Sequence, residues 1–177
     1  MRRAARAEEG QAVVELALVL PLFLILLLGL AQVGLILNTQ QQLVGVARQG
    51  ARTYALGADP RSTVAAVRLA GRQLAGFDDR VLLSTEITDE RGKAKARGSA
   101  GLLGRVGSTG GFPSAAVQKG AVRRGYWITV TVTYKYPNPI RASVLGFRLP
   151  DTITLSSSAT ARIEYDPTIP PDLGVAP

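Results

Sequence analysis

The sequence contains no cysteine and no histidine. Their absence excludes thiol nucleophiles, the imidazole base that enzymes use most often, disulfide bonds and most zinc sites. The thirteen carboxylates leave only an Asp/Glu pair or a Ser/Lys pair as a catalytic option. Asp78–Asp79 and Asp89–Glu90 are neighbours in the chain, and we expect them to be turn or solvated residues. The composition therefore predicts no enzyme, no metal site and no cofactor.

Acidic residues are few compared with basic ones: 13 against 21, which gives a net charge of +8. Much of the excess lies between Arg91 and Arg124. In residues 89–121, Gly, Ser and Ala are frequent and periodicity is lost. Loops of this length are usually functional or disordered. The segment therefore has two interpretations, a flexible loop without a ligand or an anion-binding loop. The basic residues of the second interpretation are Arg91, Lys93, Lys95 and Arg97.

One long hydrophobic run extends from Ala12 to Leu37 and contains a single carboxylate, Glu15. About 20 apolar residues span a bilayer, so residues 11–37 are predicted to form a transmembrane helix. A charge at a membrane centre costs about 2.5–3.5 kcal/mol on insertion scales, so Glu15 indicates a function. Three arginines precede the run, and the positive-inside rule places residues 1–10 in the cytoplasm and the rest beyond the membrane. The pattern predicts a single-pass protein of the plasma (inner) membrane.

The start of this run resembles the prepilin-type signal of type IV pilins and pseudopilins, and more closely the TadE-like family of minor pilins. The resemblance rests on Glu9-Gly10-Gln11-Ala12-Val13-Val14-Glu15-Leu16-Ala17-Leu18-Val19-Leu20-Pro21 and on Val46-Ala47-Arg48-Gln49-Gly50-Ala51-Arg52. Leu16 stands where the family usually has an aromatic residue, whereas Pro21 is common there.

The resemblance implies that a membrane-embedded prepilin peptidase reads Gly10 and Glu15 and cleaves after Gly10, so that Gln11 becomes the N-terminus. It also implies a non-catalytic role in a Tad (Flp-type) pilus or secretion apparatus. The implied partners are the peptidase, other Tad pilins or pseudopilins and the inner-membrane assembly platform. In an assembled filament, Glu15 of one subunit would pair with the Gln11 ammonium of its neighbour and set the axial register.

Several alternatives stay open at this point. The run could be a secretory signal peptide cleaved after Ala31, although it is longer than the usual 7–15 apolar residues. It could be a simple anchor without processing, in which Glu15 extends to the membrane interface. The protein could also be a membrane-tethered module whose basic loop binds nucleic acid, acidic polysaccharide or lipid headgroups.

The remaining pattern predicts an α+β, pilin-like fold. An amphipathic helix over 38–57 would continue the transmembrane helix, with an apolar stripe at Leu43, Ala47, Gly50 and Tyr54. Residues 58–165 would form an extracytoplasmic head with a short helix over 61–75 and about three antiparallel strands, over 80–88, 128–136 and 152–165. Residues 166–177 contain four prolines and would form an extended tail.

Overall fold

The computed structural model describes residues 2–98, 101–103, 111–113, 122–138, 143–144, 147–148 and 150–165. The chain divides into two compact units, Met1–Asn38 and Thr39–Pro177. We describe each unit by itself and call the second unit the head. The predicted Pro-rich tail, residues 166–177, lies outside the described residues.

The first unit is the N-terminal part of helix α1, which runs from Arg2 to Ala55 with Pro21 inside it. All side chains from Gln11 to Ala31 are exposed, and nearly all of them are apolar. A helix that is hydrophobic on every side must be covered by lipid or by other protein. By length and composition, the segment that begins at Gln11 can cross a membrane.

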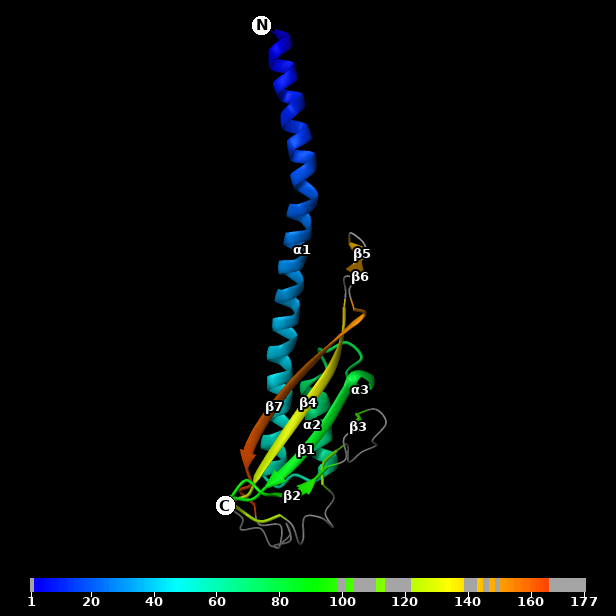
Figure 1. Cartoon of the computed structure of the whole chain (residues 1–177). Helices are drawn as coiled ribbons and strands as arrows, with labels where there is room; N and C mark the ends of the chain where they lie inside the picture. The colour runs from blue at the N-terminus through cyan, green and yellow to red at the C-terminus, as the bar shows by residue number, and fades with distance from the viewer. Residues whose placement is uncertain are drawn as a thin grey trace, which may run out of the picture. The chain divides into compact units, whose positions relative to one another are not determined.

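The head is an antiparallel sheet with helices on one face (Figure 1). Its strands lie in the order β2-β1-β4-β7, and β3 pairs with β1 beside this path. Figure 1 shows α2 and the second half of α1 on the same face of the sheet. The bounds of these elements are α2 Pro60–Ala70, α3 Phe77–Arg80, β1 Val81–Thr88, β2 Ala94–Arg97, β3 Gly101–Leu102, β4 Trp127–Pro137 and β7 Thr152–Arg162. The predicted α+β, pilin-like class is confirmed.

The three long strands match their sequence predictions closely. In β4, Ile128, Val130, Val132 and Tyr134 are buried, whereas the residues between them are partly exposed, as strict alternation predicts. The predicted third strand ends at Arg162 instead of Tyr165. The chain nevertheless stays attached to the sheet edge, because the Ile163 amide donates to the Tyr126 carbonyl at 2.7 Å.

Residues 89–121 differ from their prediction. Within the described part of this segment, β2 and β3 both pair antiparallel with β1, so the expectation of one unstructured loop was wrong there. A turn held by the Asp89 carboxylate, which accepts the amides of Arg91 and Lys93, reverses the chain from β1 into β2. The rest of the segment lies outside the described residues.

A second, smaller sheet lies between β4 and β7 in the chain. The short strands β5 (Ser143–Val144) and β6 (Phe147–Arg148) pair antiparallel and form a separate two-stranded sheet. The Asn138 side chain donates to the Pro150 carbonyl at 3.0 Å and closes the base of this excursion between β4 and β7.

Helix α1 ends where the sequence predicts an end. The amide of Ala58 donates to the Thr53 carbonyl and that of Gly57 to the Tyr54 carbonyl, which is the Schellman arrangement. Gly57 has φ +96°, a left-handed conformation that favours glycine. Asp59 then caps α2, because its side chain accepts the amides of Arg61 and Ser62.

Helix α2 is shorter than predicted, because it ends at Ala70 and not at Ala75. The chain turns at Gly71, where a Cβ atom would lie 2.3 Å from the Phe77 ring. Only glycine allows Phe77 to pack this close to the end of α2. The residues that follow form the separate short helix α3 instead of another turn of α2.

The second half of α1 packs against the rest of the head through the predicted stripe. Leu43, Ala47 and Tyr54 are each 0% exposed, and Gly50 is also buried. A Cβ atom at Gly50 would lie 2.9 Å from Val67 of α2 and 3.4 Å from Val130 of β4, so the three elements meet there. The Tyr54 ring stacks on Phe112 with centroids 5.5 Å apart.

Candidate functional site

The sequence-predicted processing residues lie on consecutive turns of α1. Gly10 and Gln11 are helical, and the Gln11 amide donates from Nε2 to Oε1 of Glu15, four residues later, at 3.1 Å. Both Gln11 and Glu15 are exposed. The single carboxylate of the apolar run is therefore held by one neutral hydrogen bond within its own helix, and its surface is open to a further partner.

Glu15 lies at one end of a large continuous apolar surface. The exposed large hydrophobic residues of the first unit begin at Val13, 66% exposed, and continue to Leu37, 57% exposed. Soluble monomers rarely expose patches above a few hundred Å², so this surface indicates a membrane or a protein partner. Pro21 lies within the same surface and does not interrupt α1, since transmembrane helices accommodate proline.

The four stripe residues are in a different environment. Leu43, Ala47, Gly50 and Tyr54 all contact the chain's own head and are inaccessible from outside it. Two backbone-directed hydrogen bonds hold the same part of α1 beside β7. The Gln40 side chain donates to the Ser156 carbonyl at 2.7 Å, and the Glu164 amide donates to the Ala55 carbonyl at 3.0 Å. The stripe therefore fixes α1 to the head.

The four candidate anion-binding residues are only partly available. Lys95 lies 3.3 Å from Asp89, and Arg97 lies 3.0 Å from Glu86. The pKa of the Asp89 carboxyl is lowered below its ordinary value because hydrogen bonds stabilise the ionised form. The backbone amide of Lys93 has the largest effect, and the Lys95 side chain and the Arg91 amide add to it. Two of the four cations thus neutralise carboxylates of the β1–β2 hairpin, which leaves Arg91 and Lys93 as exposed charges.

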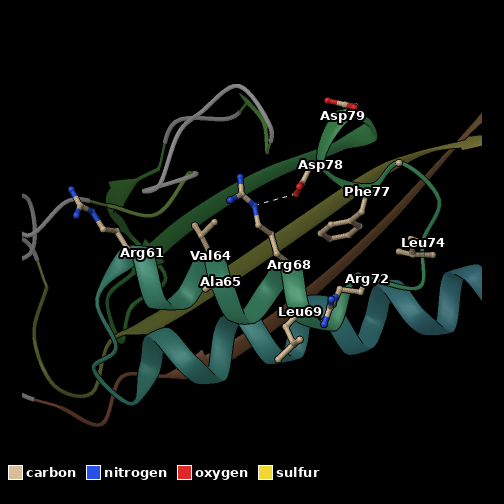
Figure 2. Close-up of a pocket in the computed structure, with 11 residues that line it drawn as sticks. Arg61, Val64, Ala65, Arg68, Leu69, Arg72, Leu74, Phe77, Asp78 and Asp79 are labelled. Atoms are coloured by element: carbon tan, nitrogen blue, oxygen red, sulfur yellow. Dashed lines mark hydrogen bonds and ion pairs between the residues drawn. The ribbon is translucent and has the colours of Figure 1, made fainter.

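A groove of about 710 Å³ lies between α2 and α3, and the sequence analysis did not predict it (Figure 2). Its centre is the Arg68 side chain, which binds Asp78 at 3.1 Å and donates to the Leu103 carbonyl at 3.1 Å. Figure 2 shows Arg68 reaching from α2 toward Asp78, with the Phe77 ring beside it. The groove is therefore organised around a partly exposed ion pair between α2 and α3, and Arg68 also holds Leu103, the residue after β3.

The described residues include no group of three or more Asp, Glu, His or Cys side chains that could hold a metal ion. In that part of the chain, each carboxylate that forms an ion pair does so with one basic side chain. The distinctive feature of the structure is thus the N-terminal segment, with Glu15 in an otherwise apolar helix.

This segment is where the chain resembles known proteins. Residues 10–52, about a quarter of the chain, match the family model described as TadE-like protein. This part of the chain is similar to the TadE-like family. The match begins at Gly10 and includes Glu15, the apolar run and three of the four stripe residues, Leu43, Ala47 and Gly50. A search of curated proteins and a search of solved structures each returned no match.

Proposed function

We propose that this TadE-like protein is a non-catalytic minor pilin or pseudopilin. A prepilin peptidase removes residues 1–10, the apolar part of α1 holds the protein in the inner membrane, and the subunit then joins or initiates a Tad-type pilus or secretion apparatus. The observation that carries this proposal is the TadE-like match together with the exposed apolar helix and its one carboxylate. The partners are the peptidase, other Tad pilins or pseudopilins and the assembly platform.

The continuity of α1 supports a membrane anchor over a secreted product. The helix runs through Ala31 and Gln32, the alternative signal-peptide cleavage site, to Ala55 without a break. The apolar run continues to Leu37, so cleavage after Ala31 would leave the exposed apolar residues Val33, Leu35 and Leu37 at the start of a secreted product. In our proposal residues 1–10 are cytoplasmic and the head is extracytoplasmic, as the leader arginines predict.

The proposed role of Glu15 follows from its chemistry. Cleavage after Gly10 creates an ammonium group on Gln11, and an ammonium and a carboxylate that enter an apolar filament core together offset part of each other's desolvation. Gln11 and Glu15 already lie on one face of α1, one turn apart. A neighbouring subunit shifted along the helix axis would therefore present its ammonium to this carboxylate and fix the register of assembly.

The test is incorporation of Glu15 variants into pili or into crosslinked subunit complexes in cells. Glu15→Gln keeps the side-chain shape and the bond from Gln11 but removes the charge, and Leu18→Ala is the control on the same exposed surface. We expect both proteins in the membrane fraction and only Leu18→Ala in assemblies. Normal incorporation of Glu15→Gln would refute the pairing role.

The binding-module alternative gains no support from the basic loop. Its two ion-paired residues, Lys95 and Arg97, stabilise the β1–β2 hairpin, so they are not free to hold an anionic polymer. We therefore do not propose the basic loop as the basis of function.

A further inference from the structure

The outer face of the sheet, opposite the helices, is mostly polar. Residues that pair across β1, β4 and β7 form rows on this face, because directly opposed side chains point to the same side. Ser and Thr occupy most positions on this face, as in the row of Ser84, Thr131 and Ser158, and Leu82 and Pro137 are apolar exceptions away from the last row. The last row is Thr88, Trp127 and Arg162. Trp127 is 41% exposed, and it is the one tryptophan in the sequence.

A polar groove of about 500 Å³ lies beside this last row. Its lining residues are Arg124, Gly125, Arg162, Ile163 and Glu164. The backbone of the groove is rigidly held, because Gly125 donates to the Ile163 carbonyl at 2.8 Å and Ile163 donates to the Tyr126 carbonyl. Gly125 has φ +95°, and a Cβ atom there would lie 3.2 Å from Oε1 of Glu90. Glycine thus keeps this part of the groove open.

The charges around the groove are balanced. Among the lining residues, Arg124 and Arg162 supply two guanidinium groups and Glu164 supplies one carboxylate, and Glu90 beside Gly125 adds a second carboxylate. Arg162 lies 3.9 Å from Glu90, at the outer limit of an ion pair, so both groups keep hydrogen-bonding capacity toward a ligand. A phosphodiester chain needs a net positive surface, and this groove does not provide one.

Balanced donors and acceptors beside an exposed aromatic ring suit an uncharged, hydroxyl-rich ligand with one apolar face. A pyranose ring has this chemistry, because its C–H groups stack on an indole face while its hydroxyls bond planar guanidinium and carboxylate groups. We propose that Trp127 and the adjoining groove bind pyranose units of a polysaccharide. Trp127 would be the stacking platform, and Arg124, Arg162 and Glu90 would bind the hydroxyls.

The proposed site lies at one end of the head. Ala55, the last residue of α1, lies against Glu164, which lines the groove. Gln40, earlier in α1, lies against Ser156 of β7. The inference rests on these head contacts alone and does not depend on processing or assembly.

The emission of Trp127 reports this site directly, because no other tryptophan contributes. The full-length protein, in a detergent without sugar headgroups, is titrated with cellohexaose, chitohexaose, an oligogalacturonate and an oligothymidylate. We expect a blue shift and protection from acrylamide quenching with at least one of the two neutral oligosaccharides, cellohexaose or chitohexaose. A response to neither of them, a response to the oligogalacturonate alone, or a response to oligothymidylate with equal affinity would overturn the proposal.

Variants distinguish the groove from nonspecific contact. Arg162→Ala and Arg124→Ala should each weaken sugar binding at least about tenfold, the factor for losing one hydrogen bond to a charged group. Arg48→Ala removes an exposed charge from α1 and should leave the affinity unchanged. Equal weakening by all three variants would contradict a defined site. Emission already protected without sugar would show that another copy of the chain covers this face, and would also refute it.

Discussion

The close approach of α1, α2 and β4 at Gly50 makes a prediction in which two similar substitutions have opposite effects. Gly45 and Gly50 lie in the same helix, and alanine at either position gains about 1 kcal/mol of helix propensity relative to glycine. At Gly45 an added Cβ atom would meet nothing within 4 Å. Gly45→Ala should therefore stabilise the head by up to about 1 kcal/mol.

At Gly50 the same methyl group would lie 2.9 Å from Cγ2 of Val67. Val67 is 0% exposed and β-branched, so its side chain has little freedom to move away. Overpacking of this kind costs about 1–3 kcal/mol, which offsets or exceeds the gain in propensity. We expect Gly50→Ala to be less stable than Gly45→Ala by about 1–3 kcal/mol, since the propensity gain is common to both.

The assay is urea unfolding of the full-length protein, followed by the emission of Trp127 and by near-ultraviolet circular dichroism. Equal m-values with a lower midpoint for Gly50→Ala than for Gly45→Ala would confirm the packing. A midpoint for Gly50→Ala at or above that of Gly45→Ala would refute the contact between α1 and α2 in the head.

Three further predictions concern the same unit. Asp59→Ala should cost about 1 kcal/mol, because α2 loses its N-cap. The hydrogen bond from the Ser62 hydroxyl, with smaller contributions from backbone amides, lowers the pKa of Asp59 from 3.8. The stability that the ionised Asp59 adds to the head is therefore present at neutral pH and is lost as the pH falls through the lowered pKa. The unfolding midpoint of Asp59→Ala should accordingly depend less on acid pH than that of the wild type. Gly71→Ala should cost about 1–3 kcal/mol, because its Cβ atom would overlap the Phe77 ring, and a wild-type melting temperature would contradict the α2–α3 turn. Leu43→Ala should cost about 2–5 kcal/mol by leaving a cavity under α1, and a smaller loss in urea unfolding would mean that α1 is not part of the core.

The sequence predicted the elements whose hydrophobic period is long and regular. The run from Ala12 to Leu37 is apolar over many turns, and the alternation from Ile128 to Tyr136 is repeated over several residue pairs, so tertiary context does not override either pattern. The stop at Gly57 was also predictable, because a helix end needs a residue that accepts a positive φ.

The short strands β2 and β3 were not predictable for a physical reason. Each has four residues or fewer, and their composition of Ala, Lys, Arg and Gly carries no β preference. They exist because β1 offers an edge and because Asp89 closes the turn before β2. Both conditions depend on the folded head and are invisible in the local sequence.

The candidate sites divide in the same way. The roles of Gly10 and Glu15 could be proposed from sequence, because a glycine followed by a lone carboxylate at the start of an apolar run is a local pattern, and these roles stay a prediction. The α2–α3 groove and the Trp127 site depend on residues far apart in the chain. Trp127 and Arg162 become neighbours only through the register of β4 and β7, which no local pattern specifies.

The central claim is that this TadE-like protein is made as a precursor and cleaved after Gly10. Its most direct test is the intact mass of the membrane-fraction protein, expressed with and without a prepilin peptidase. We predict loss of residues 1–10, with Gln11 at the N-terminus, only when the peptidase is present. Retention of Met1 in both samples, or an N-terminus at Gln32 in either, would contradict the account.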